Sequence, residues 1–422
     1  MADEPVDLDK VITLNDVYEA RESMKNSGII ETELYDSDNL QAVTGCKLFL
    51  KLELQQRCRS FKSRGAYNKI RKLKPGSTVC TVSSGNHSQG IAYAAQKCKC
   101  KAIIYMSQAA SPDKISATKA YGASVTLVGN NFDEAFQALE EDMKKHPDWV
   151  FVSPYDDADV IAGNGTLGLE ILDQCPNVQT VVVPVGGGGL ISGVAYVLKK
   201  LKPDIRIVGV QMKSSPYAYY KWRNHKYSTN DVVQKESRTP LADGIAIRNT
   251  GSLNLPFIYQ LVDEFVIVKE DDVALAVSLL AERGKLISEG AGAVAFAAIR
   301  SKKIDVKDDE VVVAIVSGGN ISLQMLARCI DRALFLNGTR KSLQVILPYG
   351  TNYIYQMTKV LVDNHAEILS CENVSHVDTV ANKEHYSVVI DIANPNSMDV
   401  IEEEFKKRRW HLVVEKTEYY DD

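Results

Sequence analysis

The sequence lacks a hydrophobic run long enough to cross a membrane, since no stretch of its 422 residues approaches the roughly 18 consecutive apolar residues that a spanning helix needs. Its first ten residues, MADEPVDLDK, are acidic and contain no apolar segment of the kind that a secretory signal carries. An excess of basic residues is also missing, because 49 Lys and Arg stand against 54 Asp and Glu, for a net charge of −5. We therefore expect a cytoplasmic protein that binds neither nucleic acid nor membrane.

Paired cysteine spacings are absent as well. The eight cysteines are scattered, and the only close pair lies in KCKC at 97–100. A C-x-C pair alone is neither a zinc nor a redox signature. We expect reduced, mostly buried thiols and no metal site.

Short runs rich in Val and Ile do occur, and from about residue 45 to 330 they alternate with segments of helical period. This alternation predicts an α/β fold in which helices cover both faces of parallel sheets. The predicted strands are 78–82, 102–106, 124–128, 180–185, 205–210, 264–268 and 311–316. Residues 271–285 are one of the predicted helices, because their apolar side chains fall close to one stripe.

The pattern changes after residue 341. Strands are predicted at 342–349, 367–378, 385–393 and 411–417, and helices at 353–366 and 397–410. The resulting βαββαβ order is that of a ferredoxin-like unit, so we expect a separate small domain at 342–422.

Four consecutive glycines, Gly186, Gly187, Gly188 and Gly189, stand where an apolar strand ends and a helix begins. Successive glycines can turn their N–H groups toward one point, and a helix N-terminus adds partial positive charge, so a phosphate is favoured there. The dinucleotide fingerprint G-x-G-x-x-G is not met, because Ser192 occupies the third glycine position. A tight turn with close helix packing is the alternative interpretation.

Two further strands end in polar, glycine-containing loops. Residues 83–90, SSGNHSQG, follow the strand 78–82 and suit a carboxylate, although Ser and Asn are also ordinary helix caps. Residues 317–319, SGG, follow the strand 311–316. Ligands of open α/β sheets bind at this edge, so we expect the three strand ends to face one crevice.

Lys62, in SFKSRGA at 60–66, has no acidic residue between Gln55 and Asp113 to pair with it locally. Most lysines are solvated surface charges, but a lysine desolvated in a cleft has a lowered pKa and can react with a carbonyl. An aldehyde that carries its own phosphate would make this lysine and the glycines one site. Pyridoxal phosphate is such a molecule.

Seven motifs in this order resemble the fold type II pyridoxal-phosphate enzymes, and specifically the threonine dehydratase (threonine ammonia-lyase) family, with serine racemase and serine dehydratase as close relatives. The motifs are SFKSRGA, SSGNHSQG, VIAGNGTLGLEI (160–171), VPVGGGGLISG (183–193), LADGIAI (241–247), EGAGAVA (289–295) and SGGNI (317–321). The resemblance covers residues 10–335. It implies a tryptophan synthase β-like fold in which two parallel-sheet subdomains hold pyridoxal 5′-phosphate between them.

The resemblance also implies roles for individual residues. Lys62 matches the lysine that binds the cofactor covalently and later takes the Cα proton, and Phe61 matches the aromatic residue beside the ring. Asn86 matches the partner of the phenolic oxygen, Gly244 lines the ring face, and Ser317 faces the pyridine nitrogen. The four glycines match the phosphate cup, while Ser83, Ser84, Gly85, Asn86 and His87 match the loop that receives the substrate carboxylate. The implied reaction converts L-threonine to 2-oxobutanoate and ammonia, and L-serine to pyruvate and ammonia.

Departures from the family pattern leave two alternatives open. Ser84 stands where dehydratases usually carry Ala and where racemases carry the serine that reprotonates Cα, which favours some racemisation. Gln211 and Tyr217 replace the acidic metal ligands of racemases, so we expect that cation site to be absent. Asn164 replaces the usual Gln of AGQGT, and we expect it to stay clear of the chemistry. The alternatives are a serine racemase or serine dehydratase, and a catalytically silent amino-acid-binding protein.

The C-terminal unit resembles an ACT domain, the regulatory module of many threonine dehydratases. We expect a catalytic domain at 1–335, with a small subdomain at about 53–158, and an ACT-like domain at 342–422. The resemblance implies an amino-acid effector, as in isoleucine biosynthesis, although only Gly350 of the usual first-loop pattern is kept; plain dimerisation is the alternative. The expected assembly is a homodimer or homotetramer.

Overall fold

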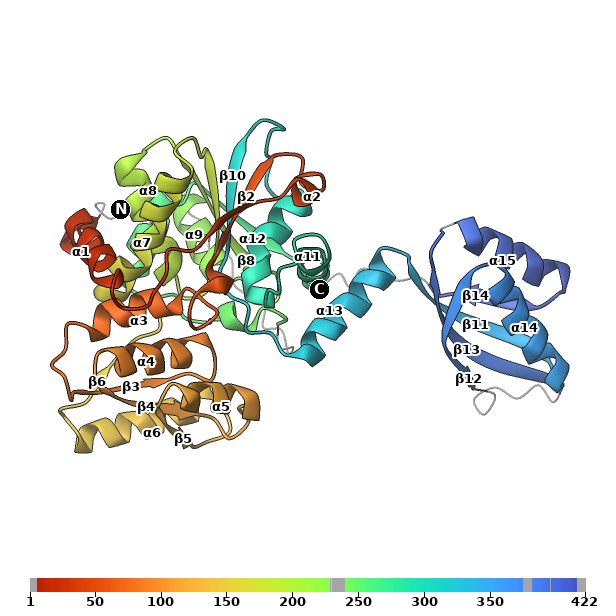
Figure 1. The fold of residues 1–422 in the computed structure, drawn as a ribbon, viewed down its shortest axis with the longest axis horizontal. Helices are drawn as coiled ribbons and strands as arrows, with labels where there is room; N and C mark the ends of the chain where they lie inside the picture. The colour runs from red at the N-terminus through yellow and green to blue at the C-terminus, as the bar shows by residue number, and fades with distance from the viewer. Residues whose placement is uncertain (1–5, 228, 230–239, 375–381, 395, 416–422) are drawn as a thin grey trace. The chain divides into compact units, whose positions relative to one another are not determined.

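The computed structural model describes residues 6–227, 229, 240–374, 382–394 and 396–415 (Figure 1). Contacts divide the chain into a first unit that ends at Ser322 and a second unit that begins at Leu323. The helix α13, Leu323–Leu336, thus groups with the second unit, whereas the sequence suggested that it closes the catalytic domain. No helix in the described part of the chain combines the length and apolar character needed to cross a membrane.

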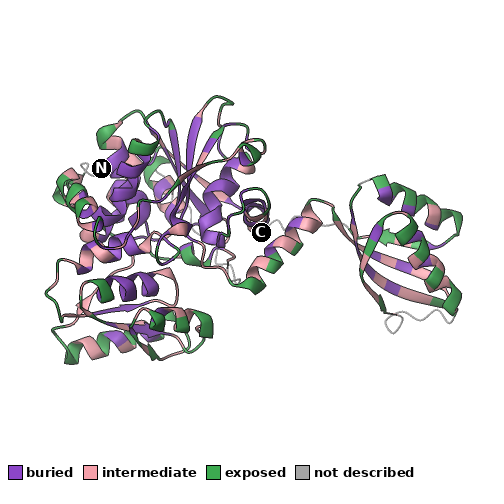
Figure 2. Cartoon of the chain, viewed as in Figure 1, coloured by how far each residue is buried: buried purple, intermediate pink, exposed green. Residues whose placement is uncertain are grey.

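The first unit is built on two sheets, of which the larger has six strands. Their order is β1 (Leu34–Asp36), β2 (Lys47–Leu52), β10 (Val311–Val316), β7 (Thr180–Pro184), β8 (Arg206–Met212) and β9 (Glu264–Val268). All neighbours pair in parallel except β1, which runs antiparallel to β2. Every residue of β7 and β10 is buried, because helices cover both faces (Figure 2).

The smaller sheet contains four parallel strands. Their order is β5 (Ser124–Leu127), β4 (Lys101–Met106), β3 (Thr78–Val82) and β6 (Val150–Phe151). The helices α4 (Asn86–Lys97), α5 (Pro112–Ala120) and α6 (Phe132–Lys145) belong to this subdomain. Its core is formed by the buried faces of α4, β3 and β4, including Ile91, Val79 and Ile104.

The remaining helices of the first unit pack around the larger sheet or between the sheets. They are α1 (Leu14–Met24), α2 (Asp38–Gln41), α3 (Lys62–Ile70), α7 (Ala158–Gln174), α8 (Gly189–Leu201), α9 (Tyr217–Tyr227), α10 (Asn254–Leu261), α11 (Glu270–Glu282) and α12 (Gly290–Arg300). Three short 3₁₀ helices, η1 (Leu8–Lys10), η2 (Glu53–Gln55) and η3 (Asp243–Ile245), complete it. Helix α12 is buried along nearly its whole length, which explains its composition of small and apolar residues.

The parallel α/β fold predicted from the sequence is confirmed, and each of the seven predicted strands is present within two residues of its expected ends. The sequence did not reveal β1, β2 and β6. Strands β1 and β6 have only three and two residues, and β2, KLFLKL, contains two lysines among its apolar side chains. Such short or mixed segments carry little periodic signal, so their pairing depends on the neighbouring strand.

The second unit is the predicted βαββαβ arrangement. After α13 it consists of β11 (Arg340–Pro348), α14 (Thr351–Asp363), β12 (Ala366–Asn373), β13 (Lys383–Ile392), α15 (Asn396–Lys407) and β14 (His411–Val414). The four strands form one antiparallel sheet in the order β12-β13-β11-β14, which is the ferredoxin-like topology. The predicted strand residues 375–378 and 416–417 lie outside the described residues.

Candidate active site

Lys62 is the first residue of α3, and the chain brings α4 very close to it. A Cβ atom at Gly90 of α4 would lie 3.1 Å from the carbonyl carbon of Lys62, so only glycine permits this approach without a shift. The backbone N–H of Phe61 donates to the carbonyl oxygen of Ser317, at 3.1 Å. The lysine is therefore held between α4 and the carboxyl end of β10.

The Lys62 side chain is directed toward the segment that connects the two subdomains. Its Nζ donates to the carbonyl oxygen of Pro154, at 2.7 Å, and lies 5.0 Å from the centre of the Phe61 ring. Burial lowers the pKa of Lys62 to about 8, although the Glu289 carboxylate opposes the shift. A substantial fraction of this amine is therefore neutral near physiological pH, as a nucleophile or base requires.

The four glycines form the turn from β7 into α8. Gly188 has a φ of +100°, a backbone conformation that other residues rarely adopt. A Cβ at Gly187 would lie 2.3 Å from the Tyr155 ring, and one at Gly189 would lie 2.8 Å from the Tyr155 carbonyl oxygen. The Asn254 amide fixes the turn from the other side by donating to the carbonyl oxygen of Gly187, at 3.1 Å.

The glycine turn lies next to Lys62, because two consecutive residues of the chain contact them. Pro154 accepts the hydrogen bond from Lys62, and Tyr155 packs against Gly187. The turn is also the N-terminus of α8, whose first N–H groups lack partners within the helix and attract an anion. A ligand with an anionic end and a carbonyl group can therefore place the anion at the glycine turn and the carbonyl group at the Lys62 amine.

Residues 83–85 connect β3 to α4, which begins at Asn86. The N–H of Gly85 donates to the Ser83 hydroxyl oxygen, at 3.2 Å, and Ser84 is partly exposed beside it. Ser88, in the first turn of α4, donates its hydroxyl to the Gly85 carbonyl oxygen, at 2.6 Å. These bonds leave the start of α4 available to a carboxylate, since it has the partial positive charge of a helix N-terminus.

His87 follows this loop and is buried. Its Nε2 lies 3.0 Å from the carbonyl oxygen of Val152. Burial, with help from the positive charge of Lys62, lowers the pKa of His87 to about 3. The imidazole is therefore neutral at physiological pH and donates to Val152 rather than carrying charge.

Asn86 is clamped from two sides. Its Nδ2 donates to Glu289 Oε1 at 2.6 Å, and its Oδ1 accepts from Asn320 Nδ2 at 2.7 Å. Both partners lie more than 200 residues further along the chain. The amide therefore has one orientation, set by the carboxyl end of the larger sheet.

The end of β10 and the start of α12 meet at Ser317 and Gly318. The Ser317 hydroxyl is buried and donates to the carbonyl oxygen of Ala291, at 3.3 Å. A Cβ at Gly318 would lie 2.3 Å from Glu289 Oε1, so glycine is needed for the carboxyl group to fit. Gly244, in η3, lies against the same region, because its Cβ would be 3.2 Å from that of Ala291.

Glu289 is the residue that the sequence analysis did not select. Its side chain is buried, and burial together with the Asp243 charge raises its pKa to about 7. The hydrogen bond from Asn86 acts in the opposite direction and favours the carboxylate. It is the first residue of EGAGAVA, so the motif marked the segment but not the function of its carboxyl group. The sequence alone does not indicate that Glu289 contacts Asn86, because the two residues are 203 positions apart.

Asn164 contacts the backbone of the glycine turn, and the expectation that it takes no direct part in the chemistry stays a prediction. Its Nδ2 donates to the carbonyl oxygen of Gly189, at 3.2 Å, so it supports the glycine turn directly. Residue 164 lies on α7, which crosses α8 at close range because a Cβ at Gly193 would lie 2.3 Å from the Ile161 carbonyl oxygen. The tight crossing brings the amide to the turn.

Comparisons with known proteins agree with this geometry. A family model described as "Pyridoxal-phosphate dependent enzyme" matches residues 25–318, and the chain belongs to this family. A curated relative named L-threonine ammonia-lyase, from Thermotoga maritima, is 40% identical over 363 residues, which is 85% of this chain and 88% of the relative. The resemblance inferred from the motifs is thereby confirmed at the level of the family.

Solved structures give the same result. Threonine deaminase isoform 2 from Solanum lycopersicum, in its processed form, superposes with a TM-score of 0.71 and 33% identity, covering 79% of this chain and 96% of that one. Maize serine racemase superposes with a TM-score of 0.69 and 28% identity, covering 77% of this chain and 98% of the racemase. The fold is thus shared by proteins named for deamination and for racemisation.

The residues present fit pyridoxal phosphate. A turn in which a Cβ at Gly187, Gly188 or Gly189 would clash suits the phosphate, and a partly neutral, partly buried lysine beside it suits the aldehyde. The chain is accordingly a pyridoxal-phosphate-dependent enzyme.

Proposed function

We propose that this protein is an L-threonine ammonia-lyase, which converts L-threonine to 2-oxobutanoate and ammonia and also deaminates L-serine to pyruvate. The observation that carries the proposal is the partly buried Lys62 amine, which donates to Pro154, the residue before the Tyr155 that packs on the glycine turn. The naming of the Thermotoga maritima relative, over most of both chains, supports the choice of reaction.

The proposed cofactor contacts follow from the geometry. Lys62 would hold the aldehyde, and Phe61 would lie beside the ring. Gly186, Gly187, Gly188 and Gly189 would hold the phosphate, with Asn86 at the phenolic oxygen, Gly244 at the ring face and Ser317 at the pyridine nitrogen. When bound, pyridoxal phosphate supplies an electron-accepting ring that weakens the Cα–H bond of an attached amino acid.

The chain's own residues would then carry the proton transfers. The Lys62 amine, whose pKa is lowered to about 8, would take the Cα proton as a general base. The loop of Ser83, Ser84, Gly85, Asn86 and His87 would bind the substrate carboxylate. A Ser317 hydroxyl ionises far too weakly to protonate the pyridine nitrogen, so it would favour loss of the β-hydroxyl over storage of charge in the ring.

Serine racemisation is the second candidate, because Ser84 stands at the position of the racemase acid. Against it, Gln211 occupies a position where racemases hold a cation ligand. Its Oε1 accepts the backbone N–H of Tyr219, at 2.9 Å, so the amide helps to hold the start of α9 instead. We therefore rank racemisation as a side activity.

Incubation of the purified protein with L-threonine and with L-serine tests the choice. We expect 2-oxobutanoate from threonine as the dominant product, measured by lactate dehydrogenase coupling or hydrazone formation. D-serine, measured by chiral chromatography, should remain a minor product. Dominant D-serine would replace the proposal by a racemase, and binding of amino acids without turnover would replace it by a silent binding protein.

For the remainder of the chain, we propose a catalytic domain at 1–335, with its small subdomain at about 53–158, and an ACT-like regulatory domain at 342–422. The antiparallel sheet and the βαββαβ order of the second unit support this division. The proposed assembly is a homodimer or homotetramer, with an amino acid as effector. Turnover measured with and without isoleucine or valine tests the effector, and light scattering tests the assembly.

A further inference from the structure

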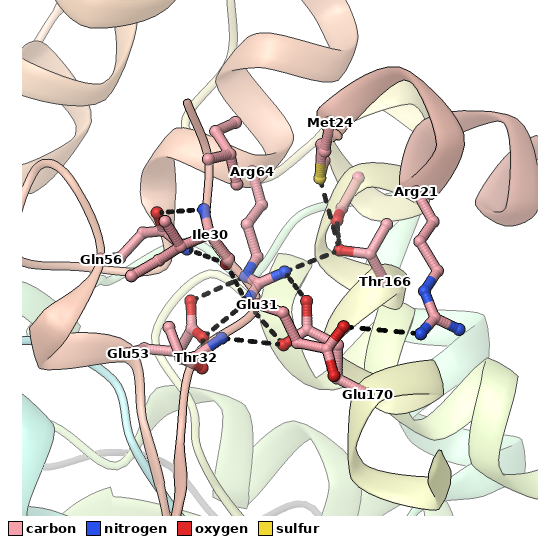
Figure 3. Close-up of polar contacts among 12 residues, drawn as sticks. Arg21, Met24, Ile30, Glu31, Thr32, Glu53, Gln56, Arg64, Thr166 and Glu170 are labelled. Atoms are coloured by element: carbon pink, nitrogen blue, oxygen red, sulfur yellow. Dashed lines mark hydrogen bonds and ion pairs between the residues drawn. The ribbon is translucent and has the colours of Figure 1, made fainter. Parts of the chain in front are cut away.

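A cluster of four charged side chains lies inside the first unit, on the side of α3 away from the contact between Lys62 and Pro154. Its members are Lys51 of β2, Glu53 of η2, Arg64 of α3 and Glu170 of α7, and each is at most 5% exposed. Figure 3 shows Arg64 between Glu53 and Glu170. Two positive and two negative charges make the cluster electrically balanced. The family site described above does not include any of them.

Arg64 is the centre of this cluster. Its Nε and Nη2 donate to the two oxygens of Glu53, both at 2.8 Å. Its Nη1 and Nη2 donate to the two oxygens of Glu170, at 2.5 and 2.9 Å. Thr166 accepts a further bond at 3.2 Å, so the planar guanidinium is held in one orientation from both sides.

Lys51 links the cluster to the larger sheet, because it belongs to β2. Its Nζ lies 2.7 Å from Glu170 Oε2 and donates to the carbonyl oxygen of Thr32, also at 2.7 Å. In the sheet, Lys51 pairs in register with Ile315, close to the strand end that carries Ser317. Through Glu170, the cluster thus connects α3 to β2, beside the end of β10 that precedes Ser317.

A buried cluster of this kind does little for stability by itself. Desolvation of the charges offsets much of their attraction, and apolar residues of similar volume often stabilise a protein as well or better. What the cluster supplies is geometry, because two bidentate pairs fix both the direction and the position of the arginine side chain. That constraint acts on the helix to which Arg64 belongs.

The same helix begins with Lys62. Because an α-helix turns by about 100° per residue, side chains two residues apart point about 200° from each other. Arg64 is anchored on one side of the helix, while Lys62 extends on the other side toward the carbonyl oxygen of Pro154. Further along α3, Asn68 Nδ2 donates to the Asp159 carbonyl oxygen at 2.7 Å, and Lys69 pairs with Asp157 at 2.8 Å. These contacts hold the later part of the helix, whereas Arg64 is the charged anchor in the turn that begins with Lys62.

We propose that Arg64, clamped by Glu53 and Glu170, is a positioning residue that sets the rotation and axial position of α3 and thereby places the Lys62 amine against Pro154. The proposal rests on the proposed function only in taking Lys62 as the reactive amine. A displacement of about 1 Å at such a group can lower a rate about 100-fold.

The test compares Arg64→Lys with the matched control Arg71→Lys. Arg71 lies just beyond the end of α3, and its Nε donates to Asn68 Oδ1 at 2.9 Å. Lysine keeps the charge but cannot form two bidentate pairs. We expect kcat of the Arg64→Lys holoenzyme to fall by about 10- to 100-fold with KM changed less than about threefold. Arg71→Lys should stay within about twofold of the wild type.

A second measurement reports on Lys62 without turnover. Full-length protein freed of cofactor is mixed with pyridoxal phosphate, and the rate of covalent capture is followed by absorbance across pH. In the wild type the midpoint should lie at about 8, as expected from the lowered pKa of Lys62. In Arg64→Lys, an amine displaced toward water should shift the midpoint upward by about one unit, which slows capture about tenfold at neutral pH.

The outcomes separate the two claims. Wild-type protein that captures no cofactor would contradict the proposed function. A folded Arg64→Lys protein with the wild-type midpoint and kcat, even with a lower melting temperature, would overturn the positioning role alone. If Arg64→Lys does not fold, Glu53→Gln serves in its place, since it keeps the shape and one acceptor, and an unchanged midpoint and kcat would again overturn the proposal.

Discussion

The Lys62 amine lies 2.7 Å from the carbonyl oxygen of Pro154. This contact crosses 92 residues of sequence and joins the start of α3 to the segment that follows β6. The next residue, Tyr155, packs on the glycine turn, so one short segment sets the separation between the amine and the anion site.

Replacement of Lys62 by Ala should abolish deamination, with a loss of about 10⁴-fold or more, because both the covalent attachment and the base are removed. The visible absorption of the bound cofactor should also disappear. Lys72→Ala is the control, since Lys72 is a more exposed lysine paired with Asp159 beyond the end of α3. Full activity in the Lys62 variant would refute the assignment.

Gly187→Ala should weaken cofactor binding, because the new Cβ would lie 2.3 Å from the Tyr155 ring. Overpacking of this kind costs about 1–3 kcal/mol, which corresponds to about a 10- to 100-fold loss of affinity. Equilibrium dialysis with pyridoxal phosphate measures it. Adding Tyr155→Ala should recover part of the loss, and a Gly187→Ala protein with wild-type affinity would contradict the packing described above.

Glu289 should make stability depend on pH. Its folded pKa is raised from 4.5 to about 7, so the folded state holds a proton that the unfolded state releases. The stabilisation is complete below about pH 4.5 and is lost as the pH rises through 7, by up to about 3 kcal/mol. Urea unfolding of cofactor-free protein at pH 5 and 8 should show this loss, and Glu289→Gln should reduce it. An equal pH dependence in wild type and variant would count against a raised pKa.

Lys114→Ala should weaken substrate binding modestly. Lys114 of α5 lies 3.0 Å from Asp243, beside Gly244, so the pair connects the small subdomain to the wall of the crevice. Both side chains are well exposed, at 39% and 54%, and such pairs contribute at most about 1 kcal/mol. We expect KM to rise about two- to fivefold, with added salt raising KM of the wild type more than that of the variant. Lys119→Ala, on the same helix, is the control.

Ser84→Ala should separate the two reactions that the site could support. Deamination should stay within about twofold, while any D-serine formation should fall by about 100-fold, the usual contribution of a general acid. Parallel assays of 2-oxo acid and D-serine on the same preparation provide the comparison. Equal losses of both activities would instead show that Ser84 acts in substrate binding.

Much of this protein was determined by the sequence alone. The glycine turn, the position of Lys62 and the βαββαβ order are encoded locally, because strand and helix periods and the backbone freedom of glycine act over a few residues. Only the tertiary structure decided which distant groups meet. Asn86 and Glu289 are 203 residues apart, and Arg64 reaches Glu170 across 106 residues. The raised pKa of Glu289 and the lowered pKa of Lys62 have the same main origin, since the burial that causes both shifts exists only after the chain has folded.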